Sequence, residues 1–153
     1  MILIGLGLAG IAIIVATGIG CWKMFAPNEE ISNDEPLTDG EWISYEMVSV
    51  SASYLMGKTK HYPKIAIICG SGLAGLADLL EETDIFPYSQ IPNFPMSTVS
   101  GHKSRMIFGL LDNIPLMLMQ GRFHAYEGYP LEKCAMPVRV MKLCGIEDLI
   151  VTT

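Results

Sequence analysis

The chain has 153 residues, half of them hydrophobic, and carries a formal net charge of -6 at pH 7. This length suits one domain. The acidic balance, with basic residues that form no stripe, argues against nucleic acid as a partner. Its four cysteines show neither CxxC nor metal-ligand spacing, which predicts reduced thiols in a cytosolic protein and no metal site.

Residues 1–26 form the most apolar segment. From Ile2 to Trp22 no charged residue interrupts the run, and about 20 apolar residues suffice to span a bilayer as a helix. We therefore predict a single transmembrane or anchoring helix in residues 1–26, with the following domain facing the cytosol because Lys23 comes directly after the run. A cleaved signal peptide fits less well, since no Lys or Arg precedes the run. A segment foreign to the following domain is the remaining alternative.

Residues 27–41 are acidic and poor in apolar side chains, which predicts a linker. Residues 42–153 then show the apolar patterns of alternating helices and strands, typical of an α/β fold. We predict helices over residues 42–57 and 131–143. We predict strands over residues 65–69, 104–110, 115–119 and 148–152.

The first segment that could carry a chemical function is Gly70-Ser71-Gly72. It follows an apolar strand pattern and precedes leucines at helical spacing, which predicts a strand, a glycine turn and a helix. Glycine lets the backbone approach a ligand, and the Ser71 hydroxyl and the free N–H groups of a helix start can bind an anion such as phosphate. The alternative is a tight connection without a ligand.

The second such segment carries Arg122, His124 and Tyr126 at alternate positions after an apolar run. On an extended chain these three side chains share one face. Arginine can bind phosphate through two parallel hydrogen bonds, histidine can donate from either ring nitrogen, and tyrosine offers an apolar ring with a polar tip that suits a sugar. The alternative is an exposed edge with a surface arginine and a capping histidine.

These segments resemble a known family. The strings IAIICGSGLAGLADLL, SGHKSRMIFG, MQGRFHAYEGYPL and MPVRVMKLCGIEDLIVT are similar, in order and spacing, to the N-terminal half of the trimeric class of purine nucleoside phosphorylases. The resemblance covers residues 63–152 and reaches back to Trp42. It implies part of a nucleoside-phosphorylase-like α/β sandwich, with a mixed sheet flanked by helices. Methylthioadenosine phosphorylases are less similar in both the glycine turn and the arginine segment.

The resemblance also implies a reaction and its residues. Members of this family cleave purine ribo- and deoxyribonucleosides with inorganic phosphate as co-substrate and no cofactor, giving the free base and a sugar 1-phosphate. The residues expected to bind phosphate are Ser71, His102, Arg122 and His124. Tyr126 is expected to contact the ribose, with Glu127 behind it. For His102 the alternative is a solvated loop histidine, since Ser100 stands where the family has proline.

In this family the residues that recognise the purine, a second ribose-contacting histidine and an aromatic residue from a neighbouring subunit of the homotrimer come from the C-terminal half. There the family continues Asn-Ala-Ala-Gly-Gly, whereas this chain ends at Val151-Thr152-Thr153. Two interpretations follow. The chain is a truncated phosphorylase with a phosphate subsite, or a non-catalytic chain that is unstable or associates with full-length subunits. In either case the strand over residues 148–152 is expected to keep an unpaired edge.

Overall fold

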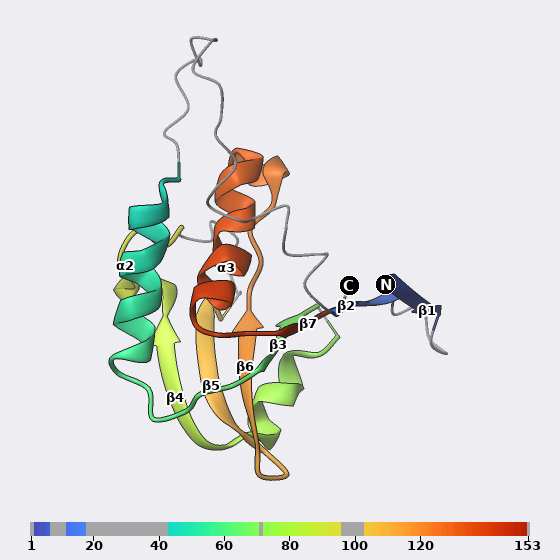
Figure 1. Cartoon of the computed structure of the whole chain (residues 1–153). Coiled ribbons are helices and arrows are strands. Elements are labelled where there is room, and N and C mark those ends of the chain that lie inside the picture. Colours follow the sequence, from blue (N-terminus) through green and yellow to red (C-terminus); the bar gives the residue numbers. More distant parts are fainter. Residues whose placement is uncertain (1, 7–11, 18–42, 71, 96–102, 153) are drawn as a thin grey trace, which may run out of the picture.

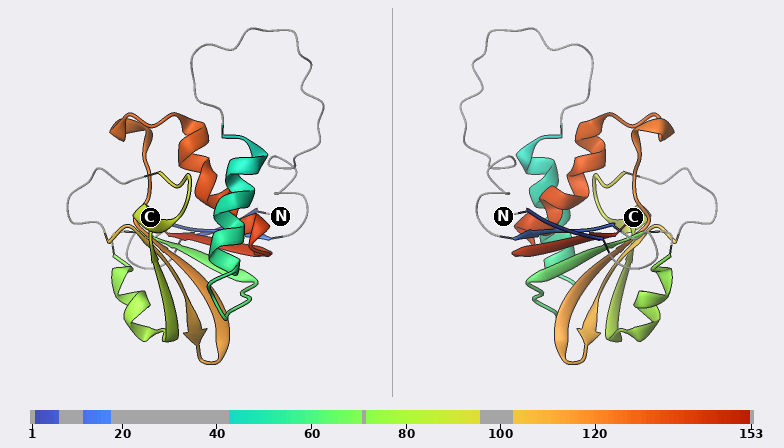
Figure 2. Two further views of the ribbon diagram at one scale, coloured as in Figure 1. Left: turned by 90° about the vertical axis from the view of Figure 1, so that its left-hand side faces the viewer. Right: turned by 90° about the vertical axis from the view of Figure 1, so that its right-hand side faces the viewer.

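The computed structural model describes residues 2–6, 12–17, 43–70, 72–95 and 103–152. They form one seven-stranded mixed sheet with the order β1-β2-β7-β3-β6-β5-β4. Two α-helices cover one face of this sheet, and a short 3-10 helix lies on the other (Figures 1 and 2). The predicted α/β class, with a mixed sheet and flanking helices, is confirmed.

The strands are β1 (Ile2–Leu6), β2 (Ala12–Thr17), β3 (Ile65–Cys69), β4 (Glu81–Pro87), β5 (Arg105–Leu111), β6 (Ile114–Gln120) and β7 (Asp148–Thr152). The helices are α2 (Tyr45–Met56) and α3 (Leu131–Leu143), with 3-10 helices η2 (Ala74–Leu79), η3 (Tyr88–Gln90) and η4 (Ala125–Glu127). Strand β3 runs parallel to both β6 and β7, while β5 is antiparallel to β6. The carboxyl ends of β3, β6 and β7 therefore meet at one edge of the sheet.

The predicted helices and strands of the domain are confirmed to within about three residues at each end. Two elements differ from expectation. Strand β4 was not predicted, because most of its side chains are exposed and only Phe86 is buried. The helix expected after the glycine turn is a six-residue 3-10 helix, η2. Gly75 lies inside it, and glycine disfavours a longer α-helix.

The transmembrane helix predicted for residues 1–26 is wrong where the structure describes that segment. Strands β1 and β2 form an antiparallel pair there, and β2 pairs with β7. Isoleucine and valine suit strands, and glycine is unfavourable in helices. No helix in the described part of the chain is long and apolar enough to cross a bilayer. Residues 18–42, with the predicted linker over 27–41, lie outside the described residues, so the domain boundaries stay predictions.

Pairing with β2 also overturns the expectation of an open edge at β7. This strand has β3 on one side and β2 on the other, so its backbone groups have partners along both edges. The edge strands of the sheet are instead β1 and β4. In this arrangement β7 therefore offers no open edge to another chain.

The main core lies between the sheet and the two α-helices. Its fully buried members include Leu55 on α2, Met136 on α3, and Phe108 and Met117 on the strands. A smaller core lies between the sheet and η2, with Leu118 at its centre. Burial of this apolar area is the main source of folding free energy. Cys69 and Cys144 are buried in these cores as free cysteines.

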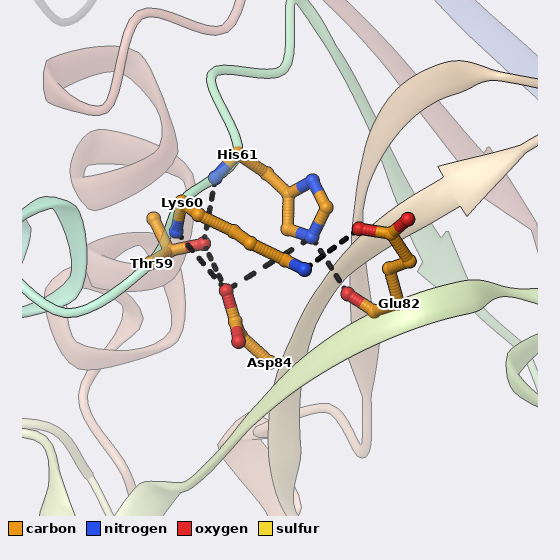
Figure 3. A network of polar contacts seen from close by, with 5 residues as sticks. All are labelled: Thr59, Lys60, His61, Glu82 and Asp84. Atoms are coloured by element: carbon orange, nitrogen blue, oxygen red, sulfur yellow. Dashed lines mark hydrogen bonds and ion pairs between the residues drawn. The ribbon is translucent and has the colours of Figure 1, made fainter.

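A polar network joins the connection between α2 and β3 to the edge strand β4 (Figure 3). The Thr59 hydroxyl donates to Asp84 Oδ2 at 2.9 Å, and the Lys60 N–H donates to the same oxygen at 3.1 Å. The ring nitrogen Nε2 of the buried His61 lies 2.7 Å from the Glu82 carbonyl oxygen. Burial alone would raise the pKa of Asp84, but these hydrogen bonds and the neighbouring His61 and Lys60 hold it below its ordinary value.

This network predicts a pH-dependent contribution to stability. At pH 7, Asp84→Asn should lower the free energy of unfolding by about 1 to 2 kcal/mol, because two hydrogen bonds to a charged group are weakened. The folded-state pKa of Asp84 lies below its ordinary value, so this contribution is complete above the ordinary pKa of the group and is lost as the pH falls through the lower folded-state pKa. Urea unfolding at pH 7 and pH 3 should show the difference between wild type and variant shrinking in acid.

The matched control is Glu147→Gln, which removes an exposed carboxylate paired with Lys64 at 2.7 Å. Its effect should be smaller at both pH values, because water screens exposed ion pairs. An Asp84→Asn effect of the same size at pH 7 and pH 3 would contradict the prediction.

Candidate functional site

The two segments singled out in the sequence begin at neighbouring strand ends. Cys69, the last residue of β3, pairs with Gln120, the last residue of β6. Adjacent strands lie about 4.8 Å apart, so the glycine turn after β3 and the arginine segment after β6 leave the sheet side by side. Ser71 and His102 themselves lie outside the described residues, and their roles stay predictions.

The glycine turn is held by a buried hydroxyl from β7. The Gly70 N–H donates to Thr152 Oγ1 at 2.7 Å, and the same hydroxyl donates to the Ile68 carbonyl at 3.0 Å. The Gly70 carbonyl in turn accepts from the Leu73 N–H at 3.1 Å. Among the described residues, no atom lies within 4 Å of a Cβ atom placed at Gly72, which is exposed. Because η2 is a short 3-10 helix, the expectation that an α-helix begins after the turn is wrong. The candidate hydrogen-bond donors for an anion are therefore those of the turn itself.

Tyr88 fixes the backbone at the start of the arginine segment. Its hydroxyl donates to the Gly121 carbonyl at 2.7 Å and lies 3.2 Å from the Gln120 carbonyl. Burial, with a smaller contribution from Cys69, raises the pKa of Tyr88 far above its ordinary value, so this hydroxyl stays protonated and donates. The Tyr88 ring also packs against Phe123, with 5.2 Å between ring centroids. The backbone is therefore fixed on both sides of Arg122, whose side chain is half-buried.

A second hydrogen bond orders the end of β6. Arg105 Nε donates to Gln120 Oε1 at 2.7 Å, and these two residues are paired across β5 and β6. The chain then turns sharply at Gly121, which has φ +99°. A second guanidinium thus lies beside the strand end from which Arg122 emerges.

His124, Tyr126 and Glu127 form a compact turn after Arg122. The prediction of one extended face is wrong for Tyr126, because the chain leaves the extended conformation after His124 and enters η4 at Ala125. The rings of His124 and Tyr126 nevertheless stack, with centroids 4.7 Å apart and an interplanar angle of 12°. Glu127 Oε1 accepts from the His124 N–H at 3.1 Å, so this carboxylate braces the backbone that carries the imidazole. Tyr126 is 78% exposed, which leaves its outer ring face accessible.

Sequence reasoning did not identify Thr152 or Tyr88 as residues of this site. Each looks like an ordinary strand or core residue, and no motif marks it. The segment that carries Arg122 and His124 leaves the sheet beside the glycine turn, and guanidinium and imidazole groups are both able to bind an oxyanion. Within the described ranges, no group of three or more His, Cys, Asp or Glu residues is arranged to hold a metal ion.

Comparison with known proteins places these features in a family. The model of the phosphorylase superfamily matches residues 64–153, which include both the glycine turn and the arginine segment. The chain belongs to the phosphorylase superfamily. The superfamily match leaves residues 1–63 outside it, and these include β1, β2 and α2.

The curated relatives of this phosphorylase-superfamily chain include purine nucleoside phosphorylases. That of Anopheles gambiae is 54% identical over 117 residues, which cover 76% of this chain and 33% of the relative. That of Mus musculus is 52% identical over 109 residues, which cover 71% of this chain and 38% of the relative. The chain therefore spans between a third and two fifths of the length of these proteins.

Solved structures give the same relationship. Isoform 2 of the purine nucleoside phosphorylase of Schistosoma mansoni, in complex with cytosine and ribose-1-phosphate, superposes with a TM-score of 0.63 and 45% identity. The match covers 67% of this chain and 36% of that one. The Schistosoma mansoni enzyme in complex with inosine gives a TM-score of 0.62 at 45% identity, over 67% and 36% of the two chains. The chain is thus purine nucleoside phosphorylase-like in both sequence and fold.

Proposed function

We propose that this chain carries the phosphate subsite, and part of the ribose subsite, of a purine nucleoside phosphorylase. The reaction is the phosphate-dependent cleavage of a purine ribo- or deoxyribonucleoside to the free base and ribose or deoxyribose 1-phosphate, a pentosyl transfer. The observation that carries the proposal is the pairing of Cys69 with Gln120, which sets the glycine turn beside the arginine segment. The relatives that share both segments are purine nucleoside phosphorylases.

In this proposal Ser71, Arg122 and His124 hold inorganic phosphate, with His102 beside them. A phosphate oxygen attacks the anomeric carbon of the sugar while the bond from that carbon to the purine nitrogen breaks, and its electron pair leaves with the purine. The sugar passes through an oxocarbenium-like transition state. A correctly aimed nucleophile can lower such a barrier by roughly 7 to 11 kcal/mol, so residues that only hold phosphate contribute to catalysis.

The stacked rings of His124 and Tyr126 support adjacent roles, His124 at the phosphate and Tyr126 at the sugar. The exposed face of Tyr126 would contact the ribose, and Glu127 would keep His124 in place through the backbone hydrogen bond. Inorganic phosphate is a co-substrate, and no cofactor is part of the proposal. The homotrimeric state, the cytoplasmic location and the purine nucleoside that is preferred stay predictions.

A non-catalytic role is the second candidate, because the chain spans between a third and two fifths of the relatives' length. Such a chain would associate with full-length subunits through the part of the fold that both share. The two candidates agree on the phosphate subsite and differ in turnover.

Phosphate binding tests the subsite directly. Titration of the full chain with inorganic phosphate in a calorimeter should show saturable binding, and Arg122→Ala should weaken it by about 10- to 100-fold, since charge-assisted hydrogen bonds contribute roughly 1.5 to 3 kcal/mol. The matched control is Lys64→Ala, which removes the same charge just before β3, at the opposite end of that strand. Unchanged affinity in Arg122→Ala, or no binding by the native chain, would contradict the proposal.

A further inference from the structure

The carboxyl end of β7 carries a buried hydroxyl that bonds across to the glycine turn. Thr152 is only 3% exposed. Backbone pairing between β3 and β7 runs from Ile65 to Ile68 on β3, and the Thr152 side chain adds the next bonds beyond it. Its oxygen accepts from the Gly70 N–H at 2.7 Å and donates to the Ile68 carbonyl at 3.0 Å.

These two hydrogen bonds fix each other's direction. A hydroxyl can donate one hydrogen bond, and here it donates to the Ile68 carbonyl. A lone pair of the hydroxyl oxygen therefore points toward the Gly70 N–H. Gly70 is buried, and a buried N–H without a partner is strongly unfavourable. The Thr152 hydroxyl therefore supplies the hydrogen-bond acceptor that the buried Gly70 N–H requires.

Both hydrogen-bonding groups of the Gly70 backbone have partners. Its N–H is held by Thr152 and its carbonyl by the Leu73 N–H at 3.1 Å. Glycine has more backbone freedom than other residues, so this position relies on hydrogen bonds rather than on sterics. With both groups of Gly70 bonded, the start of the glycine turn has one defined backbone orientation.

We propose that Thr152 is a positioning residue for the phosphate subsite, and that its hydroxyl sets the geometry of the glycine turn for an oxyanion. The proposal rests on the proposed function, because it requires that this turn bind phosphate. It adds that a residue from β7, which need not touch the phosphate, determines the affinity. A merely structural hydroxyl would change stability and leave phosphate affinity alone.

The test compares two substitutions in the full chain. Thr152→Val keeps the side-chain shape without the hydroxyl and should weaken the binding of inorganic phosphate about 10-fold. Thr152→Ser keeps the hydroxyl and should restore affinity to within about 3-fold of the native chain. Calorimetric titration gives the affinity, and urea unfolding gives the stability of each protein. Equal affinity in Thr152→Val and the native chain would overturn the inference.

The matched control is Ser51→Ala in α2. Ser51 is another fully buried hydroxyl, bonded to the Pro92 carbonyl at 2.6 Å and the Met47 carbonyl at 3.0 Å. Its loss should lower stability without changing phosphate affinity. If Ser51→Ala weakens phosphate binding as much as Thr152→Val does, general destabilisation explains both, and the inference fails.

A measurement on the native chain covers the case in which Thr152→Val does not fold. In ¹H–¹⁵N NMR spectra the Gly70 amide signal should shift on titration with inorganic phosphate and saturate at the calorimetric affinity. A Gly70 signal that stays unchanged while phosphate binds would overturn this inference alone. Absence of phosphate binding by the native chain would overturn the proposed function as well, so the two failures are distinguishable.

Discussion

The 153-residue chain by itself is expected to give no measurable phosphorolysis of inosine. In the family that it resembles, the residues that stabilise the departing purine come from the C-terminal half. Removing a single interaction that stabilises developing charge can cost on the order of 10² to 10³ in rate. Loss of the base site, part of the ribose site and the neighbouring subunit's aromatic residue together should place turnover below detection.

The assay is the phosphate-dependent release of hypoxanthine from inosine. It compares the chain alone with the same chain joined to the C-terminal half of a related purine nucleoside phosphorylase, which should restore turnover. Arg122→Ala in the joined protein should abolish the restored turnover, whereas Lys64→Ala should not. Robust turnover by the chain alone would require a base site built from residues that we assign to the core.

Substituting Gly121 by alanine should have the second-largest effect. Gly121 has φ +99°, and a Cβ atom there would lie 3.2 Å from Ser104 Cα and 3.3 Å from the Ser104 nitrogen. Both neighbours are backbone atoms, which cannot move aside as a flexible side chain can. We expect a loss of roughly 1 to 3 kcal/mol in the free energy of unfolding. Phosphate affinity should fall at least about 10-fold, because relief of the contact displaces Arg122.

Gly128→Ala is the matched control for this prediction. Gly128 also has a positive φ, +86°, but a Cβ atom there meets nothing within 4 Å. It should therefore share the backbone strain and lack the collision. Urea unfolding and phosphate titration of both variants separate the effect of backbone strain from the effect of the collision with Ser104. Equal effects of the two substitutions would mean that the contact with Ser104 contributes nothing.

The sequence was most informative where an apolar run is bounded by turn residues. The strands β3 and β7 and the helix α3 have the predicted bounds, because buried segments must be apolar and their ends must leave the core. Strand β4 could not be predicted in this way, since an exposed edge strand with one buried side chain, Phe86, has no apolar pattern. The N-terminal segment failed for the opposite reason. An uncharged apolar run suits a membrane helix and a paired strand equally, and the partner strand decides between them.

The same division applies to the candidate site. The residue types of Arg122 and His124 predicted an anion site, and parallel strands brought their segment beside the glycine turn. The supporting hydroxyls could not be predicted, because their partners are remote in the sequence. Tyr88 bonds a carbonyl 33 positions away, and Thr152 bonds an N–H 82 positions away. A single hydroxyl carries no signal of such a pairing, which only the strand order of the folded sheet reveals.

The bond between Gly70 and Thr152 also bears on the order of events during folding. Closing a loop of that length carries a conformational entropy cost that local contacts do not offset. The glycine turn is synthesised early, yet the hydrogen bond that holds it has to wait for Thr152, which is synthesised 82 residues after Gly70. A nascent chain that ends at β6 would contain the glycine turn and still lack the hydroxyl that binds its Gly70 N–H. An oxyanion that binds the ordered glycine turn would then stabilise only those chains in which β7 has already paired with β3.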